Sequence, residues 1–121
     1  MFQTAPAAVS DAQPDDPRGI VTRYFRAWND GDASIVDQLI GDDWVDHAHP
    51  ERRNAEDVAR AIGESRATRP ATRVLVDAVL GDGELVTVNG RIEDGARTEG
   101  RVWLVRVQDG RLREIWTYSA D

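Results

Sequence analysis

Apolar residues in the first third of the chain recur at the spacing of an α-helix. One helical face is formed by residues at positions i, i+1, i+4, i+5 and i+8, namely Ile20, Val21, Tyr24, Phe25 and Trp28. Pro17 suits the first turn of such a helix, and Gly31 in the sequence NDGD suits its end. The pattern therefore predicts a helix that begins near Pro17 and ends before Gly31.

Two further helices are indicated between residues 32 and 69. Asp32 can cap a short helix, which Gly41 would end, with an apolar face of Ile35, Val36, Leu39 and Ile40. Asn54 can cap a third helix, with an inward face of Val58, Ala61 and Ile62. Between them, the sequence WVDHAH at residues 44–49 is typical of a short strand or extended segment.

After Pro70 the hydrophobic period changes to two. Four runs rich in β-forming residues follow, at 72–80, 84–92, 97–107 and 111–118. The sequences GDG, EDG and QDG separate these runs and are typical of hairpin turns. Helices followed by a strand meander indicate the α+β class, with three N-terminal helices packed against a curved antiparallel sheet that forms a cone.

Composition narrows the classes of protein. With 121 residues, the chain is expected to form one domain over residues 17–121, preceded by a disordered arm at residues 1–16 that is rich in Pro, Ala and Asp. The net charge of −7 disfavours nucleic acid and anionic membranes as partners. No apolar run approaches the roughly 20 residues that span a bilayer, and the N-terminus lacks the features of a signal peptide. The absence of cysteine fits a reducing compartment, so a cytoplasmic location is expected.

Candidate chemistry concentrates in the sequence DDWVDHAHPE at residues 42–51. It holds the chain's two histidines, His47 and His49, among four carboxylates. This stretch could be a catalytic pocket, since a histidine can exchange a proton near neutral pH. It could also hold a metal through the H-x-H pair, although no third ligand stands at a fixed spacing, or it could be an ordinary polar loop. If Val45, His47 and His49 share one face of the strand, Trp44, Asp46 and Ala48 share the other.

Two long segments resemble the NTF2-like superfamily, in its SnoaL-like or ketosteroid-isomerase-like branch. They are YFRAWNDGDASIVDQLIGDDWVDH and RVWLVRVQDGRLREIWTYSAD, and the resemblance covers about residues 18–121. It implies a cone-shaped pocket for an apolar small molecule and a homodimer formed through the open sheet. The fold hosts isomerases, polyketide cyclases, epoxide hydrolases, dehydratases and non-catalytic binding modules, so it does not fix the reaction.

The resemblance also implies roles for single residues. Tyr24 matches the tyrosine that ketosteroid isomerases use on their first helix, whereas the position of their base falls on Ala48 or His49 and that of their protonated aspartic acid falls near Trp103. His47 matches the family's histidine in V-x-H, and Asp121 stands near the position of a carboxylate at the end of the last strand. A cofactor-free acid/base enzyme is therefore expected, with Tyr24, His47 and Asp121 as catalytic residues.

The remaining pocket residues are expected from their chemistry and position. Aromatic walls and polar rim groups would bind the substrate, in the set Trp28, Asp46, His49, Arg91, Trp103 and Trp116. The strand arginines as a group are assigned to the solvated face or to a dimer interface, and Arg91 is the one expected to face inward. The alternative is a non-catalytic binding or dimerisation module, which would have a filled cone instead of an open pocket with converging ionisable groups.

Overall fold

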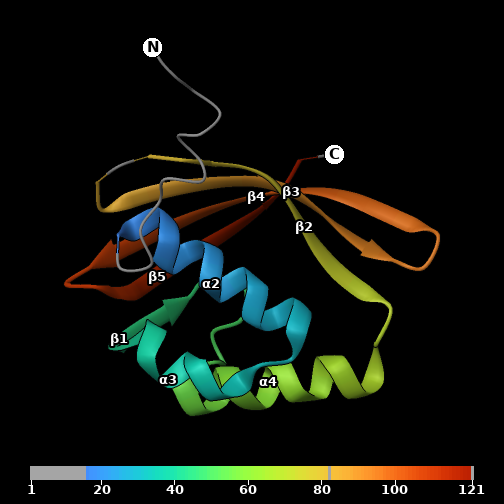
Figure 1. Ribbon diagram of the computed structural model, residues 1–121, viewed down its shortest axis with the longest axis horizontal. Helices are drawn as coiled ribbons and strands as arrows, with labels where there is room; N and C mark the ends of the chain where they lie inside the picture. Colours follow the sequence, from blue (N-terminus) through green and yellow to red (C-terminus); the bar gives the residue numbers. More distant parts are fainter. Residues whose placement is uncertain (1–15, 82, 121) are drawn as a thin grey trace.

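One curved sheet covers a layer of helices, and α2 lies between the sheet and α4 (Figure 1). The computed structural model describes residues 16–81 and 83–120. The helical elements are α2 (Pro17–Asp30), a 3₁₀ turn η1 (Ala33–Ile35), α3 (Val36–Leu39) and α4 (Ala55–Thr68). The strands are β1 (Ile40–Asp46), β2 (Thr72–Leu80), β3 (Leu85–Asp94), β4 (Arg97–Gln108) and β5 (Arg111–Ser119).

The sheet has the order β1-β5-β4-β3-β2 and confirms the α+β class. The four predicted runs form the antiparallel meander β2 to β5, as the hairpin signals indicated. The sheet as a whole is mixed, because β1 joins its edge parallel to β5. The expected arm at residues 1–16 lies outside the described residues, except for Asp16.

The first helix confirms the prediction from the sequence. The Asp16 carboxylate accepts a hydrogen bond from the Gly19 N–H at 2.9 Å, and Pro17 occupies the first turn. At the other end Gly31 has φ 71°, a left-handed conformation that glycine adopts without strain, and its N–H donates to the Ala27 carbonyl. The apolar face of α2 packs against the concave side of the sheet.

The second predicted helix is shorter than the sequence indicated. It consists of η1 and the single turn of α3, and Ile40 already has the extended backbone of β1. Gly41 therefore lies inside the strand and does not end the helix. A Cβ on Gly41 would stand 2.9 Å from Nη1 of Arg113, so the glycine leaves room for that side chain. Pairing with β5, far along the chain, decides this boundary.

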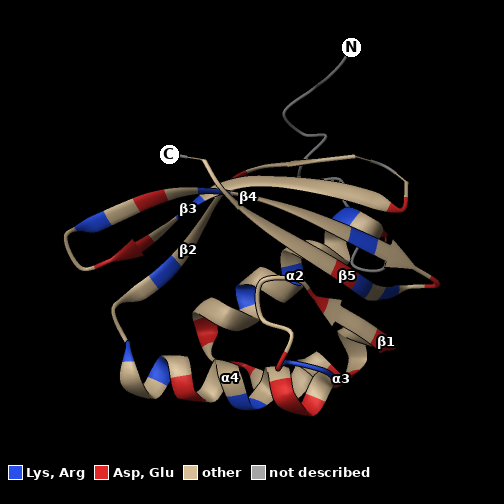
Figure 2. Cartoon of the chain, turned by 180° about the vertical axis from the view of Figure 1, so that it is seen from behind, with Lys and Arg blue, Asp and Glu red and all other residues tan. Residues whose placement is uncertain are grey.

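The third helix begins as expected at Asn54, whose side chain accepts from the Asp57 N–H at 2.9 Å. The Asp57 carboxylate in turn accepts from the Arg53 N–H at 3.0 Å. These two hydrogen bonds together stabilise the first turn of α4. Acidic and basic residues alternate along α4 (Figure 2). Val58 and Ile62 are fully buried and attach this charged helix to the core.

β2 approaches β3 closely at Gly90 in the curved sheet. A Cβ on Gly90 would lie 2.3 Å from the carbonyl oxygen of Leu75, so only glycine permits this contact. The β2–β3 register shifts between Val76 and Ala78, which marks a β-bulge. The bend makes the inner face of the sheet concave, and the core and the cavity lie there.

Asn29, in the last turn of α2, binds the helix to the edge strand β2. Its amide nitrogen donates to the Val74 carbonyl at 2.7 Å, and its amide oxygen accepts from the Val74 N–H at 2.8 Å. The side chain thus supplies both hydrogen bonds that a neighbouring strand would give to Val74. Among the described residues, no helix is long and apolar enough to cross a membrane.

We expect Asn29→Ala to lower the free energy of unfolding by about 2–3 kcal/mol, because two part-buried hydrogen bonds are lost and the Val74 peptide groups lose their partner. Urea denaturation of the variant and the wild type measures this difference. Asn89→Ala is the matched control, since Asn89 lies exposed on β3, and it should change stability by less than about 0.5 kcal/mol. Equal effects of the two variants would contradict the role of Asn29.

Candidate functional site

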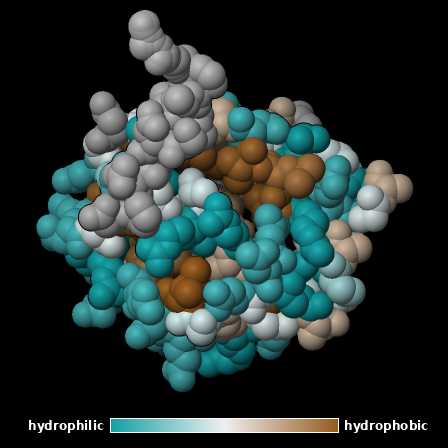
Figure 3. All heavy atoms as spheres, viewed as in Figure 1, coloured by the Kyte–Doolittle hydropathy of each residue, from teal (hydrophilic) through white to brown (hydrophobic). Residues whose placement is uncertain are grey.

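A cavity of about 260 Å³ opens between α2, the concave face of the sheet and the loop that joins β1 to α4. The residues that line it are Tyr24, Phe25, Trp28, Asp46, His49, Arg52, Ser65, Thr72, Val74, Ile92, Arg101, Trp103, Ile115 and Thr117. The cone is therefore open, as the enzyme interpretation requires. Figure 3 shows that much of the front surface is hydrophilic and that hydrophobic side chains gather over β2.

Aromatic rings from α2 and β4 form the apolar part of the wall. Tyr24 meets Phe25 edge-on with ring centroids 5.3 Å apart, and Phe25 lies 4.8 Å from Trp103. Trp28 continues the same helical face and meets Tyr24 at 6.5 Å. Such a wall suits a flat apolar ligand and keeps water away from the polar groups among the rings.

Asp46 places a carboxylate in this apolar setting. It is the last residue of β1 and is 4% exposed. Its Oδ1 accepts hydrogen bonds from the N–H groups of Ala48 and His49, both at 3.1 Å. Its Oδ2 approaches Arg52 at 4.0 Å, which is too far for a hydrogen bond. One oxygen is thus fixed by the backbone, and the other retains the capacity to take a proton.

Burial raises the pKa of Asp46 above its ordinary value, because the apolar surroundings disfavour the charged form. His49, Arg52 and the two N–H donors act in the opposite direction and do not cancel the effect of burial. A carboxyl group whose pKa is moved toward neutrality, inside a cavity, has the property expected of a proton-transfer group.

Tyr24 supplies a hydroxyl group that keeps its proton. Burial raises the pKa of Tyr24 well above its ordinary value, and the negative charge of Asp46 raises it further. A hydrogen bond from Trp28 and the charge of Arg52 act against this rise. The phenol therefore remains a hydrogen-bond donor across the ordinary pH range, able to serve an oxygen atom of a ligand.

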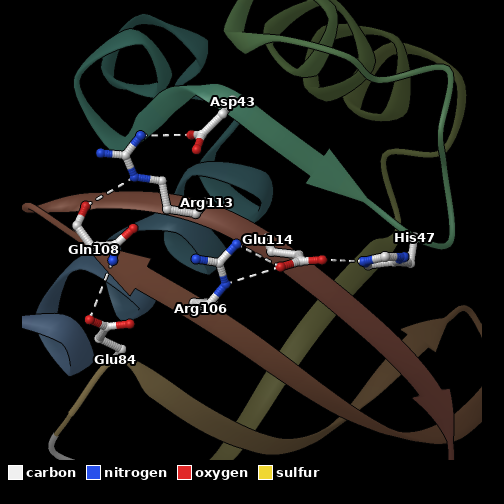
Figure 4. A network of polar contacts seen from close by, with 7 residues as sticks. All are labelled: Asp43, His47, Glu84, Arg106, Gln108, Arg113 and Glu114. Carbon is white, nitrogen blue, oxygen red and sulfur yellow. Dashed lines mark hydrogen bonds and ion pairs between the residues drawn. The ribbon is translucent and has the colours of Figure 1, made fainter.

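The two histidines do not meet in one site. His49 lines the cavity, and its Nδ1 lies 3.4 Å from Oε2 of Glu51. His47 lies on the outer face of the sheet, where its Nε2 is 2.6 Å from Oε2 of Glu114 (Figure 4). Its ring stacks on that of Trp116, with the centroids 4.8 Å apart. The strand ends at Asp46, so the chain turns between the histidines and the alternation of faces is lost.

The outer face carries a polar network of its own (Figure 4). Arg106 donates twice to Oε1 of Glu114, at 3.0 and 2.8 Å, while His47 contacts the second oxygen of that carboxylate. The contacts with His47 and Arg106 hold the pKa of Glu114 below its usual range. Arg113 donates to Asp43 at 2.6 Å and joins β5 to β1 on the same side.

The structure brings together five of the residues expected at the site and separates three. Tyr24, Trp28, Asp46, His49 and Trp103 line the cavity. His47 and Trp116 lie on the outer face, and Arg91 forms an ion pair with Asp77 at 3.0 Å, away from the cavity. Asp121 lies outside the described residues.

The sequence did not decide which face of residues 44–49 points inward. Trp44 and Asp46 are buried while Val45 is 44% exposed, so the face of Trp44 and Asp46 is the inner one.

Arg52, Arg101 and Thr72 line the cavity. None of the three was among the predicted site residues, and Arg101 belongs to the strand arginines that were expected on the solvated face or at a dimer interface. Arg101 precedes Trp103 by two residues on β4, so strand alternation could have placed it on the same face. Arg52 lies in the loop between β1 and α4, where there is no helical or strand pattern of hydrophobic residues. The sequence therefore does not predict that its side chain points to the cavity. Its guanidinium lies over the Trp28 ring, 5.0 Å from the ring centroid.

The described residues contain no cluster of three or more His, Asp or Glu side chains placed to hold a metal ion. The H-x-H pair does not form one, because His47 contacts Glu114 and His49 contacts Glu51. The chemistry that this geometry offers directly is proton transfer by Asp46 next to the Tyr24 hydroxyl.

Comparisons with known proteins agree on the fold. The family model described as SnoaL-like domain matches residues 21–115. Comparison with curated proteins gives no significant match. A loop-truncated variant of IdmH, a protein of Streptomyces antibioticus, is 25% identical with a TM-score of 0.70 over 86% of this chain and 92% of that one.

Two more distant structures show the same fold. A SnoaL-like polyketide cyclase of Agrobacterium tumefaciens is 11% identical, with a TM-score of 0.70 over 85% of this chain and 90% of that one. An NTF2-like protein of Mesorhizobium loti is 21% identical, with a TM-score of 0.72 over 91% and 96%.

The raised pKa of Asp46 has a measurable effect on stability. A carboxyl group that binds its proton more tightly in the folded chain stabilises the fold below its unfolded pKa of about 3.9, and this contribution is lost as the pH rises through the folded pKa. We expect Asp46→Asn, which does not ionise, to gain stability relative to the wild type as the pH rises above about 4. Urea denaturation between pH 3 and 8 measures the difference.

Asp43→Asn is the matched control with the opposite sign. The hydrogen bond from Arg113 lowers the pKa of Asp43, so that carboxylate stabilises the fold above its unfolded pKa and loses this effect as the pH falls through the folded value. The control should therefore be less stable than the wild type above about pH 4, with a deficit that shrinks in more acidic solution. The same pH trend in both variants would contradict the burial of the Asp46 charge.

Proposed function

Because the chain belongs to the SnoaL-like family, we propose that it is a cofactor-free enzyme that transfers a proton on a small apolar cyclic or polyketide-like molecule. The observation that supports this best is the buried Asp46 carboxyl group, with its raised pKa, in an open cavity beside Tyr24. The relatives with polyketide cyclase in their description support the substrate class.

The mechanism begins with a carbonyl compound bound against the aromatic wall. Oδ2 of Asp46 removes a proton from the carbon next to the carbonyl group, and the electron pair of that C–H bond moves to form an enolate. The Tyr24 hydroxyl donates a hydrogen bond to the oxygen atom that becomes negative. Return of the proton to another carbon gives isomerisation. Attack of the enolate on a second carbonyl carbon breaks the π bond of that carbonyl group, and the resulting alkoxide takes the proton from Asp46, which gives cyclisation.

The number of carboxylates that line the cavity favours this enolate chemistry over epoxide hydrolysis. A relay that activates water for epoxide opening would need two carboxylates around an arginine. In the described part of the chain, Asp46 is the one carboxylate that lines the cavity. Because it stands alone there, we assign it to proton transfer at carbon.

The test is deuterium exchange. Cyclic ketones in D₂O are followed by NMR for deuterium uptake at the carbon next to the carbonyl group. The wild type should accelerate the uptake, and Asp46→Asn should lower this acceleration by about 10²- to 10⁴-fold, because the proton acceptor is lost. Asp43→Asn makes the same chemical change outside the cavity and should keep the wild-type rate.

His47→Ala in the same experiment separates two assignments of the base. The sequence alone assigns the proton transfer to His47, whereas the cavity supports Asp46. A variant without His47 that keeps most of the exchange favours Asp46. Loss of exchange in His47→Ala together with retention in Asp46→Asn would reverse the assignment, and no acceleration by the wild type would contradict the proposed function.

We also propose that two copies pair through the outer face of the sheet. Leu104 and Trp116 are opposite each other on β4 and β5, and both alternate with residues that point into the core. Tyr118, on the next row of β5, is 51% exposed. This apolar surface beside the Arg106–Glu114 ion pair suits a second copy of the same face.

Light scattering after gel filtration tests the dimer. We expect the wild type to have the mass of two chains and Leu104→Arg to have the mass of one, because two positive charges would meet at a symmetric apolar contact. Val76→Arg is the control, since Val76 is 39% exposed on the edge strand and lies away from the proposed contact. A wild type with the mass of one chain at micromolar concentration would refute the dimer.

A further inference from the structure

Arg52 is a cavity-lining cation whose guanidinium donors have no hydrogen-bond acceptor among the described residues. Its side chain is 22% exposed, and its guanidinium makes no hydrogen bond to another residue of the described ranges 16–81 and 83–120. The Asp46 carboxylate, at 4.0 Å, lies beyond hydrogen-bond distance. A guanidinium group has five N–H donors in a planar fork, and most proteins occupy them when the side chain is largely buried.

The contact with Trp28 holds the Arg52 side chain in place, although its N–H groups make no hydrogen bond to the described residues. The guanidinium lies over the Trp28 ring at 5.0 Å, and Trp28 itself lines the cavity. This contact presents the planar group to the cavity at low cost in side-chain entropy, since the cation and the ring hold each other. A planar fork of this kind matches the two oxygens of a carboxylate.

The other charges of the cavity agree with an anion. Arg101 brings a second guanidinium to the wall and is held there by Glu99 at 2.8 Å and by the Gly100 carbonyl at 2.9 Å. Among the lining residues that the structure describes, Asp46 is the one acidic side chain, and two backbone N–H groups already bind its Oδ1. The cavity wall thus carries two arginines and one described carboxylate, although the chain as a whole has a net charge of −7.

A purely apolar ligand would leave the Arg52 guanidinium without a hydrogen-bond partner in the cavity, at a free-energy cost.

We infer that the ligand is a small cyclic acid, whose carboxylate is bound by Arg52 while its ring lies against Trp28 and Trp103. This inference rests on the proposed function in so far as both concern the same cavity, and it adds the charge of the substrate. The cavity, at about 260 Å³, lies below the range of about 300–1,000 Å³ typical of drug-sized ligands, which favours one or two rings.

Binding of matched probe pairs tests the inference without any turnover. Benzoate is compared with benzamide, and 2-naphthoate with 2-naphthamide, by NMR titration of the indole N–H signals at neutral pH. We expect each acid to bind at least about ten-fold more tightly than its amide, because the acid alone forms charge-assisted hydrogen bonds with the guanidinium. The signals of Trp28 and Trp103 should shift, and that of Trp116 on the outer face should not.

Variants of neighbouring arginines identify the residue responsible. Arg52→Gln should reduce the preference for the acid to less than about three-fold, and Arg52→Lys should keep part of it as a point charge. Arg53→Gln is the matched control from the same loop, since Arg53 is 78% exposed and lies outside the cavity, and it should retain the full preference. Thermal unfolding of each variant checks that the fold is intact.

The outcomes separate this inference from the proposed function. Amides that bind as tightly as the acids, acids that do not bind, or an Arg52→Gln variant with an unchanged preference would each overturn the inference. Exchange of deuterium that depends on Asp46 would still support proton transfer in those cases. Conversely, Asp46→Asn should keep or increase the preference for acids, because it removes the opposing negative charge, even where it abolishes exchange.

Discussion

The parallel pairing of β1 with β5 is the interaction on which the site depends. It sets Asp46 opposite Ile115 and fixes which side chains of the segment point toward the helices. Trp44 and Asp46 face inward as a result, while Val45 is directed outward. A shift of one residue in this register would exchange the two faces and put an uncompensated histidine where the carboxylate now lies. The chemistry of the cavity is therefore a consequence of a backbone contact between residues about 70 positions apart along the sequence.

The cavity exists because the sheet bends and α2 does not fill the bend. Gly90 allows β2 to approach β3 closely, and Asn29 anchors the end of α2 to β2 through the Val74 peptide groups. Aromatic rings then line the remaining space without closing it. In that setting a single carboxylate meets a strong desolvation penalty, which two backbone N–H donors and one distant guanidinium offset only in part. The same imbalance that makes Asp46 costly for stability makes it suitable for proton transfer.

Local features of the fold were readable from the sequence. The periods of 3.6 and 2 gave α2, α4 and the meander, and the caps at Gly31 and Asn54 gave their boundaries, because each depends on residues close together in the chain. The prediction made the short helix too long by including Ile40 and placing its end at Gly41. Pairing of Ile40 with distant Leu112 makes these residues part of β1 and overrides the local preference. The position of Arg52 followed no period at all, since it is set by a loop and by contact with Trp28.

The histidine pair shows the limit of reading a site from spacing. Two histidines separated by one residue suggest a shared direction, but the strand ends at Asp46 before either is reached. His47 joins Glu114 and Trp116 on the outer face, and His49 turns to the cavity rim. From the sequence, Asp46 was expected only to bind the substrate, while His47 was expected to be catalytic. Aspartate is usually exposed, so its residue type gives no sign that it is buried here.

The protonation of Asp46 in the free protein is the most direct measure of this account. The carboxyl carbons of ¹³C-labelled protein can be titrated by NMR, with Asp46→Asn used to assign the signal. We expect a midpoint above the ordinary value of about 3.9, since burial disfavours the charged form. A midpoint at or below that value would mean that the carboxylate is fully compensated in the folded chain, and it would contradict the assignment of Asp46 as the proton-transfer group.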